Sequence, residues 1–597
     1  MDAGLNDETR SAVASVRHRT RVQRSRPRLA GALGLLALVS PATLAAAPAP
    51  GAVTGAPARD PRGLHLLPAG AAAVLRADPA ELERAAELVR SLGGDAGMAA
   101  NAVSLASASA LGFDGLSRAG WRSIGVDSEQ PVLVALGEVD PTAASSLWHV
   151  RVLARVADPR RFADWAGRSP ILGAPWHAGS PVRGALAGLL GLAADPRAEA
   201  EAARALTERG TISAGARPGG ALILVRRIGR YAAIDAFAAT DASRINWPRD
   251  AQAILERLDP PGRGAALSDR TSAGARALAR PGLVLWARPD GLFDAALTWF
   301  RPPAGCLAFR DLAPRTALID AAASLRIGAH QIALDVAWGA APGAPVTQAW
   351  PVTDDGLVGP PARGAIFSAS FYLGSTDRVR ALPRPALVAS GWVPLWRRVR
   401  GCGRTARGLL LGFAWPELAA QWLGDVAVAA PQASVLVGAA RNIGFVARKV
   451  SATDRHGWDA VLEGSLGPGG LAPAQAILDA VFGSRRASRR PRQHTGWAGQ
   501  FLHPYTLFRG KRAVLGVAMG DRARRWRLAQ PNRARRASGP IARAAGDARA
   551  LLRQLAPGMR PGLRALAAGA AARVGSFDSA VTVNNDGVRA WLHLQRR

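Results

Sequence analysis

Arginine is the residue type whose spacing most clearly suggests chemistry in this sequence. Between Arg485 and Arg543 the chain holds 16 Arg and Lys residues and a single acidic residue, Asp521. Guanidinium groups bind phosphate and carboxylate groups through paired hydrogen bonds. Aromatic residues, which add stacking or interfacial anchoring, are interleaved with these cations: Trp497, Phe501, Tyr505, Phe508 and Trp526.

This basic stretch, residues 485–543, predicts an anion-binding surface. The candidate residues are Arg485, Arg486, Arg489, Arg490, Arg492, Arg509, Lys511, Arg512, Arg522, Arg524, Arg525, Arg527, Arg533, Arg535 and Arg536. In the alternative interpretation, 485–495 is a solvated loop and the other arginines extend from ordinary helices with their charged ends in water. The expected partners are anionic envelope polymers or lipids, and nucleic acid is the second choice.

The sequence contains no recognisable catalytic motif. Its nine histidines are scattered, and none has the HExxH spacing that places two metal ligands on one helix face. GxSxG is absent, and neither Lys449 nor Lys511 lies in an SxxK or GxxxxGK[ST] motif. We therefore expect no metal, no cofactor and no catalysis. The alternative is a hydrolase whose catalytic residues are dispersed along the chain.

Cys306 and Cys402 are the only cysteines. In an oxidising compartment they would form one disulfide that links the two halves of the chain. Two unpaired, buried thiols are the alternative. No CxxC spacing is present, so a zinc or redox site on cysteine is not expected.

The N-terminal segment has the pattern of a signal peptide. Seven arginines lie between Arg10 and Arg28, and the apolar run Leu29–Val39 follows them. Pro41 ends the run, and small residues come next, so we expect cleavage after Ala45. The pattern predicts an exported protein of the periplasm or cell surface. An uncleaved N-terminal anchor is the alternative.

Length and charge set further limits. A chain of 597 residues exceeds the size of one core and predicts two or more domains. The formal charge is +32, and removing residues 1–45, which hold seven Arg and three acidic residues, leaves +28. Such a charge attracts polyanions.

Similar elements recur in the same order on both sides of the Pro/Gly-rich segment 339–362. The matched pairs are Ala72–Arg90 with Ala365–Leu382; Val132–Leu136 and Val150–Val156 with Val426–Ala429 and Gly444–Val450; Gly229–Ala238 with Gly510–Met519; Pro281–Trp299 with Pro540–Leu555; and Ala323–Trp338 with Ser579–Leu594.

The matches predict an α+β fold of two tandem related domains, each a mixed or mainly antiparallel sheet with helices packed on one face. The expected divisions are a signal peptide at 1–45, a disordered linker at 46–62, a first repeat domain at 63–338, a linker at 339–362 and a second repeat domain at 363–597 that contains the basic stretch.

Two segments carry a resemblance: LPAGAAAVLRADPAELERAAEL (Leu67–Leu88) and GFDGLSRAGWRSIGVDSEQPVLVAL (Gly112–Leu136). Together with the closing hairpin expected at Ser579–Leu594, they resemble uncharacterised exported bacterial proteins of the domain-of-unknown-function type, which are Ala/Arg-rich and come from GC-rich Gram-negative genomes. The resemblance implies an α+β repeat fold outside the cytoplasm and implies no reaction.

The sequence thus predicts an exported, non-catalytic structural or ligand-binding protein of the cell envelope that docks on anionic surfaces through its arginine-rich stretch. The alternatives are an extracytoplasmic hydrolase with a dispersed site and a nucleic-acid-binding protein. A nucleic-acid binder would need the basic residues and aromatics to form one continuous groove.

Overall fold

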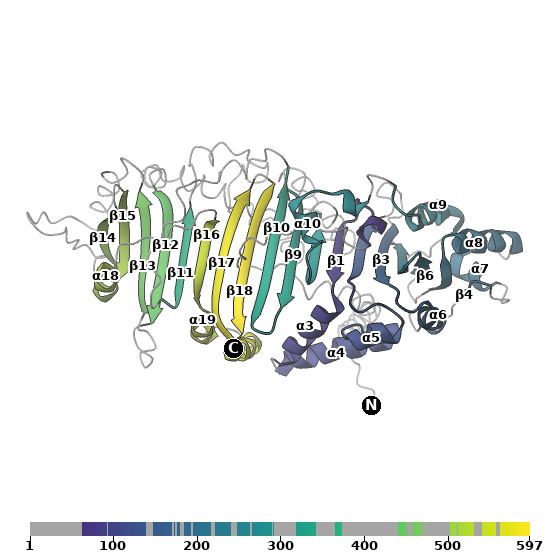
Figure 1. Cartoon of the computed structure of the whole chain (residues 1–597), viewed down its shortest axis with the longest axis horizontal. Coiled ribbons are helices and arrows are strands. Elements are labelled where there is room, and N and C mark those ends of the chain that lie inside the picture. Colours follow the sequence, from purple (N-terminus) through teal and green to yellow (C-terminus); the bar gives the residue numbers. More distant parts are fainter. Residues whose placement is uncertain are drawn as a thin grey trace, which may run out of the picture.

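The fold is built around one antiparallel sheet of 18 strands, seen in a computed structural model of the chain (Figure 1). The structure describes residues 63–91, 94–138, 147–169, 172, 176–179, 184–192, 195–216, 221–239, 247–262, 266–288, 291, 318–341, 365–372, 440–449, 458–466, 472, 502–509, 512–529, 540–556, 561–584 and 586–596.

Every strand pairs antiparallel with its neighbours. From one edge of the sheet to the other, the strands are β14 (Leu502–Arg509), β15 (Arg512–Met519), β13 (Trp458–Leu466), β12 (Ala440–Lys449), β11 (Phe367–Tyr372), β16 (Pro540–Asp547), β17 (Val574–Asn584), β18 (Gly587–Arg596), β10 (Gln331–Ala340), β9 (Leu318–Ile327), β8 (Leu283–Ala287), β1 (Ala73–Ala77), β2 (Val132–Glu138), β3 (Leu147–Arg155), β7 (Tyr231–Ala239), β6 (Leu222–Ile228), β5 (Thr211–Ala216) and β4 (Trp176–His177).

The prediction of two tandem domains is wrong, because the sheet runs without a break through both halves of the chain. Strand β10 pairs with β18 over a ladder that extends from Gln331↔Gln595 to Gly339↔Gly587. Each of these strands closes a hairpin, and an unpaired edge would leave a row of backbone N–H and C=O groups without partners. Pairing the two edges satisfies both rows at once. The predicted linker lies outside the described residues from position 342 to 362.

The order of strand neighbours is nonetheless the same on the two sides of the β10–β18 pair. One side reads β10-β9-β8-β1-β2-β3-β7-β6, and the other reads β18-β17-β16-β11-β12-β13-β15-β14. The first side continues further, through β5 and β4. One continuous sheet therefore contains two stretches with the same connectivity.

Helices lie around the sheet, mostly near its edges and strand ends (Figure 1). They are η2 (Leu64–Leu66), α3 (Pro79–Ser91), α4 (Gly94–Leu111), α5 (Arg118–Ser123), α6 (Pro159–Arg168), α7 (Ala185–Leu190), α8 (Pro196–Glu208), α9 (Trp247–Leu258), η4 (Leu267–Asp269), α10 (Ala273–Ala277), α18 (Asp521–Leu528), α19 (Ala548–Leu555) and α20 (Pro561–Arg573).

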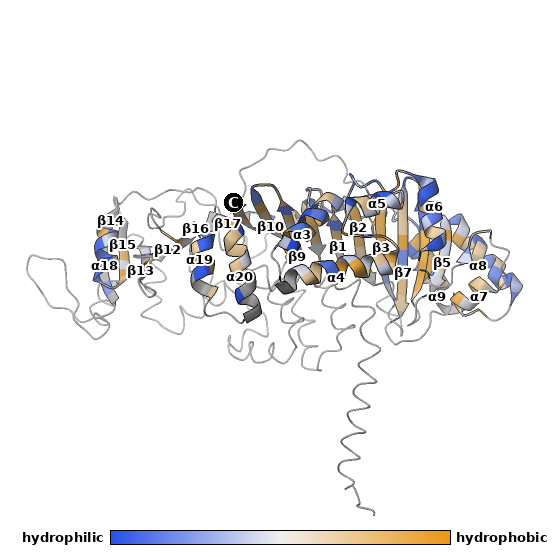
Figure 2. Cartoon of the chain, turned by 90° about the horizontal axis from the view of Figure 1, so that it is seen from below, coloured by the Kyte–Doolittle hydropathy of each residue, from blue (hydrophilic) through white to orange (hydrophobic). Residues whose placement is uncertain are grey.

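The prediction of helices on one face only is also wrong. Leu224 on β6 packs with α7, α8 and α9 on one side of the sheet. Its neighbours Ile223 and Val225 point to the opposite side and pack with α5 and α6. Because successive side chains of a strand alternate between faces, β6 is buried on both sides. Strands β3 and β7 are accordingly hydrophobic in Figure 2, whereas α6 shows much hydrophilic surface.

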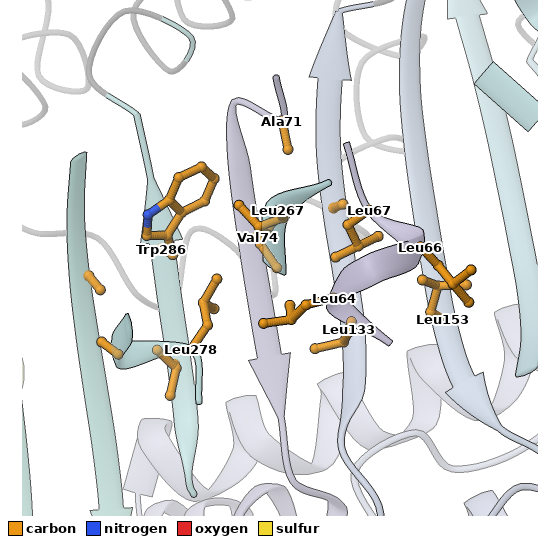
Figure 3. Close-up of a cluster of buried hydrophobic side chains, with 14 of the residues drawn as sticks. Leu64, Leu66, Leu67, Ala71, Val74, Leu133, Leu153, Leu267, Leu278 and Trp286 are labelled. Carbon is orange, nitrogen blue, oxygen red and sulfur yellow. The ribbon is translucent and has the colours of Figure 1, made fainter. Parts of the chain in front are cut away.

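The core of the first half gathers small segments from distant parts of the chain (Figure 3). Leu64 and Leu66 of η2, together with Leu267 of η4, pack over Val74 and Trp286 on neighbouring strands β1 and β8. Trp286 is completely buried. A buried side chain of this kind contributes about 1.5–3 kcal/mol by removal from water, so these short segments are held by their side chains.

The two faces of the sheet carry different kinds of side chain. One side carries Asp235, Asp335 and Glu463, and we call it the acid-bearing face; the registers of neighbouring strands place these carboxylates on the same side. The other side carries apolar residues such as Leu325 and Leu334, which are only half-buried. These three carboxylates therefore lie deeper than these leucines of the opposite face.

Gly587, the first residue of β18, occupies a position that only glycine fits. Its φ is +147°, and a Cβ there would collide with the carbonyl oxygen of Trp338 on β10. We expect Gly587→Ala to lower the free energy of unfolding by about 1–3 kcal/mol, measured by urea denaturation. Gly262→Ala is the control, because a Cβ at Gly262 meets nothing within 4 Å. Equal effects of the two substitutions would show that the β10–β18 contact is not tight.

Candidate functional site

The structure describes part of the basic stretch. The described cations are Arg509, Arg512, Arg522, Arg524, Arg525, Arg527 and Arg543. Outside the described residues are Arg485, Arg486, Arg489, Arg490, Arg492, Lys511, Arg533, Arg535 and Arg536, together with Cys306 and Cys402. The anion-binding role of the stretch and the disulfide both remain predictions.

The described cations of the stretch fall at three separate places, one of which is Arg543 on β16, paired with Asp578 at 3.1 Å. Arg509 and Arg512 are directly opposed at the tip of the β14–β15 hairpin. Helix α18, which carries Arg522 to Arg527, follows the other end of β15. At about 3.3 Å per residue, the eight residues of β15 put the hairpin tip and α18 roughly 26 Å apart. The described residues do not form one continuous basic groove.

Helix α18 uses its arginines to hold itself on the sheet. Nε of Arg527 lies 2.5 Å from Oε1 of Glu463, and Nη2 donates to Oε2 at 3.2 Å. The hydroxyl of Tyr505 donates to the same carboxylate at 2.7 Å. Arg527 is only 1% exposed, so a polymer cannot reach it.

Two further arginines of α18 also have acidic partners. Arg522 donates through Nε to Asp459 at 3.0 Å, and that carboxylate is buried. Arg525 pairs with Asp521 at 3.0 Å, one helical turn earlier, and both side chains are largely exposed. An exposed pair of this kind is weak, so Arg525 can exchange Asp521 for another anion.

A second arginine cluster lies in the interior of the first half, where strands β3, β7 and β6 are neighbours. Asp235 on β7 is fully buried, and its Oδ1 lies 2.6 Å from Nε of Arg151 and 2.7 Å from Nε2 of His149. Its other oxygen accepts from Nη1 of Arg226 at 3.1 Å. We call these four residues the Asp235 cluster.

The remaining donors of this cluster bind backbone carbonyl groups. Arg151 donates to the carbonyls of Leu66 and Arg257, at 3.1 and 2.5 Å. Arg226 donates to the carbonyls of Arg209 and Leu258, each at 2.8 Å through Nη2. These carbonyls belong to η2 and to the ends of α8 and α9. The cluster therefore fastens covering segments to the sheet, and every guanidinium nitrogen of Arg151 and Arg226 has a partner.

Electrostatics keep Asp235 ionised and His149 neutral. Burial alone would raise the pKa of Asp235, but the positive charges of Arg151 and Arg226 and the hydrogen bond from His149 hold it well below its usual range. Burial lowers the pKa of His149, and the hydrogen bond to Asp235 opposes this only in part. The imidazole also stacks on Phe237, with ring centroids 4.5 Å apart.

Among the described residues, His149 and Asp235 come nearest to the acid–base pair of a hydrolase. The imidazole is 5% exposed, and the small cavity beside it is lined by Pro68, Ala71, Gly137, Arg151 and Arg257, among others. The carboxylate is already occupied by two arginines, so the arrangement favours a structural role over proton transfer. Sequence reasoning missed this cluster, although a lone Asp in the apolar strand YAAIDAFAA signals a paired, buried acid.

Comparison with known proteins supplies no relative: no family model, no curated protein and no solved structure matches the chain. Within the described ranges, no three His, Cys, Asp or Glu side chains gather as a metal site. The helices in those ranges are too short or too polar to cross a membrane.

Removing the charge of Asp235 should strongly lower the free energy of unfolding. Asp235→Asn leaves Arg151 and Arg226 buried without their counter-ion, and we expect a loss of about 3–5 kcal/mol in the free energy of unfolding. The control is Asp127→Asn, which breaks the partly exposed pair with Arg155 at 3.8 Å and should cost under about 1 kcal/mol. Urea denaturation measures both. A loss no larger than that of the control would contradict the structural role of the cluster.

His149 should make stability depend on pH between about 5 and 7.5. The unfolded histidine titrates near about 6.5, whereas the folded one has a lowered pKa. In this window the unfolded state binds more protons, so stability falls as the pH falls. We expect His149→Gln to flatten this dependence and His177→Gln, outside the cluster, to leave it unchanged. The Asp235 contribution is lost separately, below about pH 4. If the free energy of unfolding falls equally with pH in wild type and in His149→Gln, His149 is not the source of the pH dependence.

Proposed function

We propose that this protein is an exported, non-catalytic component of the cell envelope that docks on anionic lipids or envelope polymers. The N-terminal pattern of residues 1–45 supports export, and the net charge of +32 supports an anionic partner. The internal use of the Asp235 cluster supports a structural protein over an enzyme.

The observation that carries the docking proposal is the register of the β14–β15 hairpin. Arg509 is directly opposed to Arg512, and the two residues between them are Gly510 and Lys511. Like charges at directly opposed positions destabilise a hairpin. Two opposed arginines at the end of an edge hairpin, with Lys511 between them in the sequence, therefore favour a role in binding over one in stability.

The position of this hairpin tip also favours docking. Strand β14 is the edge strand of the sheet, so its tip lies at the periphery of the described structure (Figure 1). The cations of α18 lie elsewhere, and Arg522 and Arg527 are held by buried carboxylates. Of the described parts of the basic stretch, the hairpin is therefore the one whose backbone ends at the edge of the sheet.

The test is salt-dependent binding to vesicles that contain phosphatidylglycerol. Each basic residue near an anionic surface contributes about 1 kcal/mol, so the triple variant Arg509→Gln, Lys511→Gln and Arg512→Gln should bind about 100-fold more weakly. It should also lose part of the dependence of binding on salt concentration, measured by co-sedimentation over a range of NaCl concentrations.

The control for this test removes three positive charges elsewhere. Arg160, Arg197 and Arg204 are exposed and lie on α6 and α8, towards the other edge of the sheet. Changing all three to Gln should reduce binding much less. Equal losses of binding in the two triple variants would show that binding depends on net charge and not on the hairpin. No binding by the wild type would exclude docking on anionic lipid.

A further inference from the structure

A third arginine cluster lies where the two halves of the sheet meet. It consists of Arg280, Ser324, Arg326, Asp335 and Arg589, and we call it the junction cluster. Ser324 on β9 is directly opposed to Asp335 on β10. Arg326 and Arg589 lie on the same acid-bearing face. They are opposed to residues 333 and 337 of β10, so they flank Asp335 on opposite sides along that strand. Arg280 follows α10, just before β8.

The junction cluster differs from the Asp235 cluster because its hydrogen bonds are long and incomplete. Asp335 lies 3.5 Å from Nη2 of Arg326 and 3.3 Å from Nη2 of Arg589. Charge-assisted bonds between nitrogen and carboxylate oxygen are usually about 2.7–2.9 Å. Each carboxylate oxygen contacts one arginine, so Asp335 orients both side chains without using all of their donors.

Three buried polar atoms of this cluster have no hydrogen-bond partner: Nη1 of Arg280, Nε of Arg589 and Oγ of Ser324. Ser324 is only 2% exposed. A buried donor without an acceptor costs free energy, and nearly all such groups in folded proteins find a partner. Unfilled donors gathered around one carboxylate are therefore a signal that an acceptor is missing.

The charges of the cluster do not balance. Arg326 and Arg589 contact the carboxylate of Asp335, and Arg280 is near enough to feel its charge, so three guanidinium groups and one carboxylate leave an excess of two positive charges. Burial, followed by the positive charge of Arg589, lowers the pKa of Arg280. Arg276 does not add to the excess, since it pairs with Asp586 at the turn between β17 and β18.

Solvent reaches the cluster from one side. The side chains of Arg326 and Arg589 are 40% and 34% exposed, whereas that of Asp335 is 5% exposed. The arginines thus form a rim over a buried polar floor. A small anion can approach between them, which is not so at the closed Asp235 cluster.

We infer that the junction cluster binds a doubly charged tetrahedral oxyanion, of the class of inorganic phosphate or a phosphate monoester. The charge of such an ion equals the excess of the cluster, and its oxygens accept from the unfilled guanidinium N–H groups and the hydroxyl of Ser324. Asp335 is a positioning residue, because it holds Arg326 and Arg589 apart. This site is separate from the β14–β15 hairpin tip, so either proposal can fail without the other.

The first experiment compares phosphate with chloride at constant ionic strength on the full chain. We expect phosphate to raise the melting temperature in a saturable way, since a ligand that binds only the folded state stabilises it. Arg589→Gln and Arg326→Gln should each weaken the phosphate affinity about 10-fold or more. Arg204→Gln on α8 is the control with the same change of charge. Equal responses to phosphate and chloride, or equal losses in Arg589→Gln and the control, overturn the site.

Ser324→Ala tests the site independently, in case the arginine variants do not fold. The substitution removes a hydroxyl that has no partner, so stability should not fall, while phosphate affinity should drop a few-fold. Unchanged affinity in Ser324→Ala would overturn the assigned geometry.

The second experiment identifies the source of the phosphate group. Glycerol phosphate and vesicles that contain phosphatidic acid are compared with inorganic phosphate. Loss of vesicle binding in Arg589→Gln supports a lipid headgroup as the ligand. Loss of the soluble phosphate response alone supports a free phosphate or small ester.

Discussion

The backbone pairing of β10 with β18 is the constraint on which the rest of the structure depends. Both strands end hairpins, and each would otherwise present an open edge. Their ladder turns two shorter sheets into one and brings the middle of the sequence into contact with its C-terminal part. Ala340 N donates to Asp586 O, and Arg596 N donates to His330 O, so the pairing is extended at both ends.

The same pairing determines which side chains become buried at the centre. It places Asp335 opposite Trp591 and brings Arg589 near Arg326, which is more than 250 positions earlier in the chain. Neither half alone contains the full set of charges. The excess of positive charge at the junction is therefore a consequence of sheet continuity.

Arginine has two different uses in this protein. Around Asp235 and Glu463 most of its donors are taken up by carboxylates and, at Asp235, by backbone carbonyls at segment ends, so the guanidinium groups are held inside the fold. At the junction cluster, three arginines share one carboxylate. The first use stabilises, because a buried guanidinium satisfies several acceptors at once. The second leaves positive charge for an anion from outside.

Local structure was predictable from the sequence, whereas the arrangement of its parts was not. Asp158 begins α6 and accepts from the backbone N–H groups of Arg160 and Arg161, and Phe162 and Trp165 face the core, as an Asp before an apolar pattern of helical spacing indicates. The matched segments Ala323–Trp338 and Ser579–Leu594 are equivalent hairpins in the structure, β9–β10 and β17–β18. By contrast, the match of Val150–Val156 to Gly444–Val450 is off by one strand, since the latter overlaps β12, which pairs with β11 as β2 pairs with β1. Two similar apolar strands cannot be told apart from the sequence when the strands they pair with are unknown.

The sequence by itself determined the short-range features: helix starts, tight turns, alternating strands and a large surplus of arginine. These depend on residues within a few positions of one another. Only the tertiary structure decided that there is one sheet and that the Asp235 and junction clusters exist. Hydrogen bonding between edge strands and pairing of buried charges depend on contacts across hundreds of residues, and no local pattern specifies them.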